Sequence, residues 1–347
     1  MLIYLLLAVG ILLLIPFLIL QYYLPPLPKG ANQLIAETRR EPLPDFFPGR
    51  AETVDNQGVE IWYNVLEPDT PPKATVVLVM GHSATATSFV PRVWQPLLDA
   101  GYRVIRYDNR GVGLSDWMSH TGKGNRYTLE DMATDPIAIL NQENIEQAHV
   151  WGISMGGMIA QRIGINYPKR VLSLTLVMTS AFMYDPKLVL TDPKWQRQLI
   201  AMVVRYGFFK DEINRSKFAI LLADMLKGTG DYQTDHKNAI ERSLYEWRHR
   251  RGGNPKVLRQ HSAAIAKSGS RLDELSQLKM PILVMHGTHD PLVLPMHGKK
   301  LMEHLPHAKK IWIEGLGHDL PAKYVPTMIE HTLDIFAEAD ANKVDSY

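Results

Sequence analysis

The chain has no cysteine among its 347 residues. This absence excludes disulfide bonds, a cysteine nucleophile and metal sites built on thiolates. It leaves the compartment open, because a cysteine-free chain tolerates reducing and oxidising surroundings alike. Net charge is also small, at +2, so the charge balance predicts no nucleic acid partner. Apolar residues make up 46% of the chain, which is enough to build the core of a globular domain.

Charge is missing altogether from residues 1–20, which are mostly Leu, Ile and Val. A helix of this length spans about 30 Å, the hydrocarbon thickness of a bilayer. Tyr22 and Tyr23 follow where interfacial aromatic residues are expected. The pattern predicts a single-pass transmembrane helix over residues 1–24.

Two alternatives to this anchor are a cleaved signal peptide and a core helix. The first is disfavoured because the run has no basic start and no cleavage site of small residues. The second is disfavoured because three prolines within positions 25–28 separate the run from the rest. Lys29, Arg39 and Arg40 follow the run, and the positive-inside rule then places the domain after the run on the cytoplasmic face of the membrane.

The motif Gly-Ile-Ser-Met-Gly at residues 152–156 joins a run typical of a buried strand to a run typical of a helix. A serine at such a junction lies on a tight, strained turn that exposes its hydroxyl. The glycines on either side are needed because a Cβ there would collide with neighbouring backbone. Ser154 is therefore the candidate nucleophile.

Two further residues follow strand-like runs later in the chain. Asp290 comes after the apolar run 281–285, and His318 comes after the run 310–314. The order Ser, Asp, His is the triad order of α/β-hydrolases. Because residues beyond the carboxyl ends of parallel strands share one edge of the sheet, the three can meet. His318 would act as base and acid, and Asp290 would hold its tautomer.

A tetrahedral oxyanion needs preorganised donors. The N–H of Met155, directly after the serine, is predicted as one donor. The loop after the strand-like run 75–80 should supply the other, and we assign it to the N–H of His82. Gly81 and Ser83, on either side of His82, are predicted to contact substrate.

With these residues the chain resembles the α/β-hydrolase superfamily over roughly residues 58 to 340. Val79-Met80-Gly81, the segment 107–110 and the segment 315–321 most resemble the carboxylesterases grouped with aclacinomycin methylesterase. Many relatives carry His-Gly where this chain has Met80-Gly81. The resemblance implies an α/β fold with a mostly parallel central sheet, helices on both faces and a helical cap over the active site.

The resemblance also implies a serine hydrolase that cleaves carboxylic esters, as an esterase or lipase does, through an acyl-enzyme and without cofactor or metal. With the anchor, the expected substrate is a small hydrophobic or lipid-derived ester. The same triad serves thioesters, lactones, amides and carbon–carbon bonds, and a catalytically idle membrane-tethered binding protein is the alternative from another class. A dehalogenase or epoxide hydrolase is disfavoured, because those families carry Asp at the nucleophile position.

Strand-like runs recur at 59–66, 75–80, 102–107, 148–153, 171–178, 282–286 and 310–314, mostly with helical patterns between them, which predicts a mostly parallel sheet. The expected division is a transmembrane anchor (1–24), a Pro-rich linker or strap (25–50), a hydrolase core (51–180 and 276–347) and a helical cap (181–275). The cap is rich in large apolar residues, most of which should pack the cap itself while a minority line an acyl pocket.

Three other groups have competing interpretations. Asp108 also follows a strand and could replace Asp290, although its place in the order favours a loop anchor. His286 and His289, with Asp290, could suggest a metal site, but no third ligand is evident and Asp290 already has a role in the triad. The basic run 248–251 could bind an acidic headgroup, while a solvated turn is the ordinary interpretation.

Overall fold

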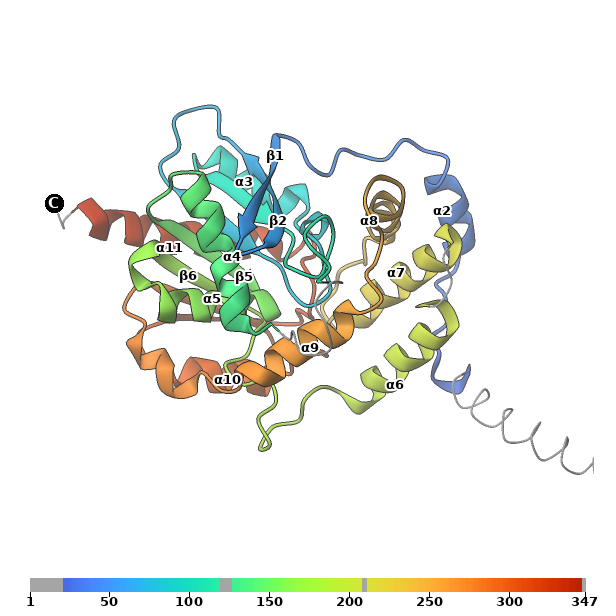
Figure 1. Cartoon of the computed structure of the whole chain (residues 1–347). Helices are drawn as coiled ribbons and strands as arrows, with labels where there is room; N and C mark the ends of the chain where they lie inside the picture. The colour runs from blue at the N-terminus through green and yellow to red at the C-terminus, as the bar shows by residue number, and fades with distance from the viewer. Residues whose placement is uncertain (1–20, 119–126, 208–210, 345–347) are drawn as a thin grey trace, which may run out of the picture.

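The computed structural model describes residues 21–118, 127–207 and 211–344. Within these residues, eight strands form one sheet in the order β1-β2-β4-β3-β5-β6-β7-β8. The strands β3 to β8 run parallel to one another, while β2 is antiparallel to β4 and to β1. The predicted mostly parallel sheet is therefore present (Figure 1). The strands are β1 (Arg50–Asn56), β2 (Val59–Leu66), β3 (Thr75–Val79), β4 (Arg103–Tyr107), β5 (Ala148–Ile153), β6 (Val171–Val177), β7 (Ile282–Gly287) and β8 (Lys309–Ile313).

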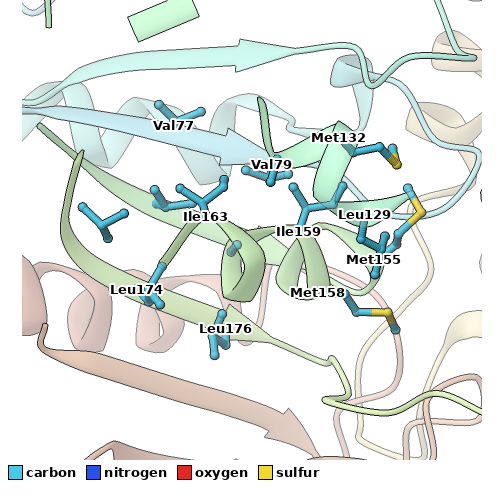
Figure 2. Packing of buried hydrophobic residues seen from close by; sticks show 14 of the residues in the cluster. Val77, Val79, Leu129, Met132, Met155, Met158, Ile159, Ile163, Leu174 and Leu176 are labelled. Atoms are coloured by element: carbon cyan, nitrogen blue, oxygen red, sulfur yellow. The ribbon is translucent and has the colours of Figure 1, made fainter. Parts of the chain in front are cut away.

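Helices cover both faces of the sheet because its central strands are apolar on both sides. Successive side chains of a strand point to opposite faces, so Val77 and Val79 pack into one core while Val76 and Leu78 pack into the other. Figure 2 shows the first core, where Val79 lies near Ile159 of α5. The first core is covered by α4 (Leu129–Gln142), α5 (Met155–Asn166) and α10 (Pro295–Glu303), and the second by α3 (Pro91–Asp99) and α11 (Val325–Val344).

Between β6 and β7 the described part of the chain holds helices and no strand. We call this segment, residues 178–281, the insertion. Its described α-helices are α6 (Pro193–Met202), α7 (Glu212–Leu226), α8 (His236–His249) and α9 (Val257–Ser268). A short π-helical turn (Val203–Gly207) follows α6, and a 3-10 helix (Leu272–Gln277) follows α9.

The described residues before β1 include a helix that packs on the insertion. Helix α2 (Ala31–Thr38) buries Ala31 and Ile35 against Ile220 of α7 and Leu244 of α8. Figure 1 shows α2 beside these two helices, on the side of the molecule away from α11. Part of the segment expected to be a linker is thus a helix docked on the insertion.

No helix in the described ranges is long and apolar enough to cross a bilayer. The uncharged run at residues 1–20, which carries the predicted anchor, lies outside the described residues.

Candidate active site

Ser154 occupies the sharp turn between β5 and α5. Its φ of 57° and ψ of −125° place it in a region that L-residues rarely adopt. Two hydrogen bonds hold the turn: the Ser154 N–H donates to the carbonyl of Val177 (2.9 Å) and the Thr179 hydroxyl donates to the carbonyl of Ser154 (2.6 Å). The side chain remains partly exposed. The expected strained turn with an accessible hydroxyl is present.

The two glycines of the motif are required by close backbone contacts. A Cβ on Gly152 would lie 2.3 Å from the carbonyl oxygen of Gly156, and a Cβ on Gly156 would lie 2.0 Å from that of Val79. Real Cβ atoms do not approach backbone so closely, so any side chain here would force the turn apart. The collision inferred from the motif is therefore found at both positions.

Asp290 and His318 lie together beyond the ends of β7 and β8. The Nδ1 of His318 is 2.7 Å from the Oδ2 of Asp290, and both side chains are almost fully buried. The other carboxylate oxygen of Asp290 accepts the N–H groups of Leu292 and Val293 at 2.9 and 2.8 Å. A carboxylate held in this way can fix the ring orientation of the histidine and keep its proton on Nδ1.

Ser154 lies at the same edge of the sheet as this pair. Within the described residues its hydroxyl makes no hydrogen bond to His318, so the structure contains the Asp–His contact and not the Ser–His contact. Hydrogen bonds between nucleophile and base are often long without substrate and tighten in the reacting complex. The role of the three residues as a triad remains a prediction supported by their order and by one of its two contacts.

The loop after β3 lies directly against the serine. A Cβ on Gly81 would stand 2.9 Å from the Cβ of Ser154 and 3.4 Å from its hydroxyl oxygen. On the other side of the serine, the N–H of Met155 belongs to the first turn of α5, where N–H groups have no acceptor within the helix and the helix dipole is positive. The structure thus brings Gly81 and Met155 to Ser154, where an oxyanion would form.

His82 and Ser83 continue this loop. The His82 ring lies within hydrogen-bond distance of two hydroxyls, Ser83 at 2.9 Å and Ser262 of α9 at 3.0 Å. Burial lowers the pKa of His82 to about 4, so the ring is neutral near pH 7. In the described part of the chain its backbone N–H has no acceptor, as an oxyanion donor requires. Ser83 is exposed and has a φ of 58°.

His261, which the motifs did not single out, joins this loop to the insertion. Its Nδ1 accepts the N–H of Ser83 at 3.0 Å, and its Nε2 lies 2.9 Å from the carbonyl of Arg110. The side chain is fully buried, and burial, with His82 nearby, lowers its pKa to about 3. His261 lies 178 residues after Ser83 in the chain, so no local sequence pattern indicates their contact.

The alternative triad acid is engaged elsewhere. Asp108 pairs with Arg250 and accepts the N–H groups of Ala86 and Leu114, each at 2.9 Å. It is therefore a loop anchor, and Asp290 is the carboxylate that contacts His318.

The candidate metal ligands and the basic run 248–251 also make structural contacts. The buried His286 directs Nε2 to the carbonyl of Val293 (2.8 Å), whereas His289 is exposed and contacts Thr288. The described ranges hold no group of three or more His, Asp or Glu that could bind a metal ion. In the basic run, the side chain of Arg250 is only 2% exposed and Arg248 binds Glu212, so the interpretation of this run as a solvated turn is wrong for Arg250.

Comparisons with known proteins agree with this fold. Residues 75–321 match the family described as alpha/beta hydrolase fold. Rhodomycin D methylesterase DauP of Streptomyces sp. (strain C5) is 28% identical over 276 residues, which cover 72% of this chain and 87% of the relative. The 3-oxoadipate enol-lactonase 1 of Acinetobacter baylyi is 29% identical over 61% of this chain and 72% of the relative.

Among solved structures, one titled as a membrane phospholipase A, a bacterial virulence factor, superposes with a TM-score of 0.62. It is 18% identical and covers 98% of this chain and 99% of its own, a likeness that shows the fold alone. The methylesterase relatives confirm the resemblance inferred from the motifs and the prediction of an enzyme of the ester-cleaving type. With the strained serine, the Asp–His pair at the sheet edge and a match over most of its length, this chain belongs to the α/β-hydrolase-fold family.

Proposed function

We propose that this protein is a serine hydrolase that cleaves carboxylic esters through an acyl-enzyme. The observation that carries the proposal is the 2.7 Å contact between His318 and Asp290 at the sheet edge that also presents Ser154. An imidazole oriented by a buried carboxylate is the base that a serine hydroxyl needs at neutral pH.

In this mechanism the Ser154 hydroxyl attacks the acyl carbon while its proton passes to Nε2 of His318. The carbonyl oxygen becomes an oxyanion that accepts hydrogen bonds from the N–H groups of Met155 and His82. Collapse of the tetrahedral intermediate breaks the bond to the leaving alcohol, which takes the proton from His318. Water then attacks the acyl-enzyme by the same route, releasing the acid and restoring the Ser154 hydroxyl.

A small hydrophobic or lipid-derived ester fits this proposal best. The sequence places an uncharged apolar run before Gln21, and Leu24 and Leu27 pack on the insertion beside Trp195 and Met202. An anchor entering there would keep the insertion close to a bilayer. Thioester, lactone and carbon–carbon substrates remain alternatives, and the enol-lactonase relative supports testing lactones beside esters.

A fluorophosphonate probe tests the enzymatic proposal, because it modifies only an activated serine. We expect labelling and turnover of p-nitrophenyl esters in the wild type and in Ser276→Ala, a control at an exposed serine. Both should disappear in Ser154→Ala. Unchanged turnover in Ser154→Ala would remove this residue from the mechanism. An unlabelled wild type that turns over no ester would favour an idle binding protein.

For location, we propose a single-pass anchor over residues 1–24 with the catalytic domain on the cytoplasmic side. The absence of cysteine makes the test direct, because one introduced thiol is the only reactive one. Glu314, whose side chain is 83% exposed, can be replaced by Cys in the full chain. We expect the protein to stay in the membrane after a carbonate wash. A membrane-impermeant maleimide should label it only after lysis. Labelling in intact cells would show that the catalytic domain lies on the outer side of the membrane.

A further inference from the structure

His261 lies in the insertion, yet its two hydrogen bonds reach loops that follow two different strands of the sheet. Nδ1 contacts the loop after β3 at Ser83, and Nε2 contacts the loop after β4 at Arg110. The carbonyl at Arg110 belongs to a fixed residue, because the guanidinium of Arg110 is itself bound to the buried Asp135 (Nε to Oδ2, 2.9 Å). The imidazole therefore ties the loop that holds His82 to a rigid point in the core.

The partners of His261 determine its protonation. A backbone N–H can only donate, so the Nδ1 that faces Ser83 carries a lone pair. A carbonyl can only accept, so the Nε2 that faces Arg110 carries the hydrogen. A proton added to Nδ1 would break the bond to Ser83. Burial in the fold favours the neutral ring, and it keeps the pKa of His261 low, at about 3.

The bond from Ser83 bears on the adjacent residue. Ser83 has a φ of 58°, a backbone conformation that a non-glycine residue adopts at a cost, so the loop needs a contact that holds it there. The peptide N–H of Ser83 is taken by His261, whereas the preceding N–H, that of His82, has no acceptor in the described part of the chain. Holding one peptide limits the directions open to the next, because only the φ and ψ of His82 separate the two.

We propose that His261 is a positioning residue for the oxyanion loop: by accepting the N–H of Ser83 through Nδ1, it keeps the N–H of His82 directed at the reacting carbonyl oxygen. The insertion then contributes a positioning side chain to the active site. This inference rests on the proposed serine-hydrolase function.

The two nitrogens of His261 can be tested separately. An Asn side chain places its amide near the position of Nδ1, so His261→Asn can keep an acceptor for Ser83 and lose the contact to Arg110. A Gln side chain reaches the position of Nε2, so His261→Gln can keep the donor to Arg110 and lose the acceptor. The readouts are kcat and KM on p-nitrophenyl butyrate and the inhibition constant of a trifluoromethyl ketone, whose adduct with Ser154 carries an oxyanion.

If His261 acts through Ser83, kcat of His261→Gln falls at least about tenfold, with KM little changed. The inhibition constant of the ketone should rise by a similar factor in His261→Gln. The kcat of His261→Asn should be at least about fivefold higher than that of His261→Gln. The two variants should have similar melting temperatures. Equal kcat values for Asn and Gln, or a loss that follows the melting temperature, would overturn the proposal.

His297 of α10 provides a matched control. It is also buried, with Nδ1 at 3.2 Å from the Ser180 hydroxyl and Nε2 at 2.9 Å from the carbonyl of Val189, but it does not contact the oxyanion loop. His297→Asn and His297→Gln should have kcat values similar to each other. A fluorophosphonate that labels Ser154 in every variant separates failure of this proposal from failure of the hydrolase assignment.

Discussion

Gly81 and Ser154 are separated by 73 positions in the chain, yet a Cβ on the glycine would stand 2.9 Å from the Cβ of the serine. The contact joins the end of β3 to the end of the neighbouring β5. The space between the nucleophile and the loop that should bind the oxyanion is therefore set by the absence of one methyl group.

Gly81→Ala should therefore damage the site directly. The new methyl would also lie 3.3 Å from the carbonyl oxygen of Ile153, so Ser154 or the loop must shift. We expect kcat to fall about tenfold to a hundredfold and the free energy of unfolding to fall by about 1–3 kcal/mol. Gly253→Ala, where a Cβ meets only the Arg215 side chain at 3.7 Å, is the control. Normal kcat in the Gly81 variant would contradict the contact.

The backbone of Ser154 predicts a stability difference between two inactive variants. Glycine adopts a φ of 57° without the penalty that a side chain brings, while alanine retains it. We expect Ser154→Gly to unfold with a free energy about 1 kcal/mol higher than Ser154→Ala, measured by urea denaturation. An alanine variant that is equally stable would show that the turn carries no strain.

Asp290→Asn should leave the fold intact and remove most of the activity. An amide in place of the carboxylate cannot stabilise the imidazolium of His318 and favours the wrong tautomer, so kcat should fall about 10³- to 10⁴-fold. Asp224→Asn is the matched control, because Asp224 pairs with His236 at 2.7 Å on the insertion. Stopped-flow or steady-state ester hydrolysis measures both, and a similar small effect of the two would exclude Asp290 as the triad acid.

Asp319, next to His318, should make stability depend on pH. Burial raises its pKa to about 6, although the Tyr232 hydroxyl donates to it at 2.9 Å. The folded chain thus binds this proton more tightly than the unfolded chain does. Its contribution to stability is fully present below the usual carboxyl pKa of about 4 and is lost as the pH rises through about 6.

Urea unfolding of the wild type and of Asp319→Asn at several pH values measures this contribution. The stability of the wild type relative to the variant should fall by about 2 kcal/mol between pH 4 and pH 7. Glu314→Gln, at an exposed side chain, should keep the wild-type profile. A constant difference between the wild type and Asp319→Asn would contradict the raised pKa.

Stability should depend far more on the buried pair of Arg250 and Asp108 than on the partly exposed pair of Arg248 and Glu212. Arg250→Met leaves Asp108 charged and unpaired in the core, which should cost about 3–5 kcal/mol of the free energy of unfolding. Arg248→Met removes a partly exposed pair and should cost about 0–1 kcal/mol. Denaturant titration of the two variants compares them, and equal losses would show that Asp108 is stabilised without its partner.

The sequence predicted those features that depend on local pattern. The apolar runs before Ser154 and Asp290 became β5 and β7 within a residue or two, because buried parallel strands are continuously apolar. The need for glycines in the nucleophile turn could also be predicted, because five adjacent residues define that turn.

The features that were missed depend on distant partners or on polar sequence. Strand β1 is largely exposed at the edge of the sheet, and its sequence RAETVDN has no apolar run. Helix α2 is short and is stabilised by burial of Ile35 on helices that come about 200 residues later. His261 could not be identified because nothing near it in the sequence indicates the N–H of Ser83.

The docking of α2 on α7 and α8 has a mechanical consequence. If the insertion moved outward as a rigid body, either Ile35 would lose its apolar contacts with α7 and α8, or α2 would have to move with the insertion. The insertion is thus held in two places, by α2 at α7 and α8 and by the imidazole of His261 in α9. We therefore expect substrate to enter and product to leave by small movements of loops, while α7, α8 and α9 stay in place.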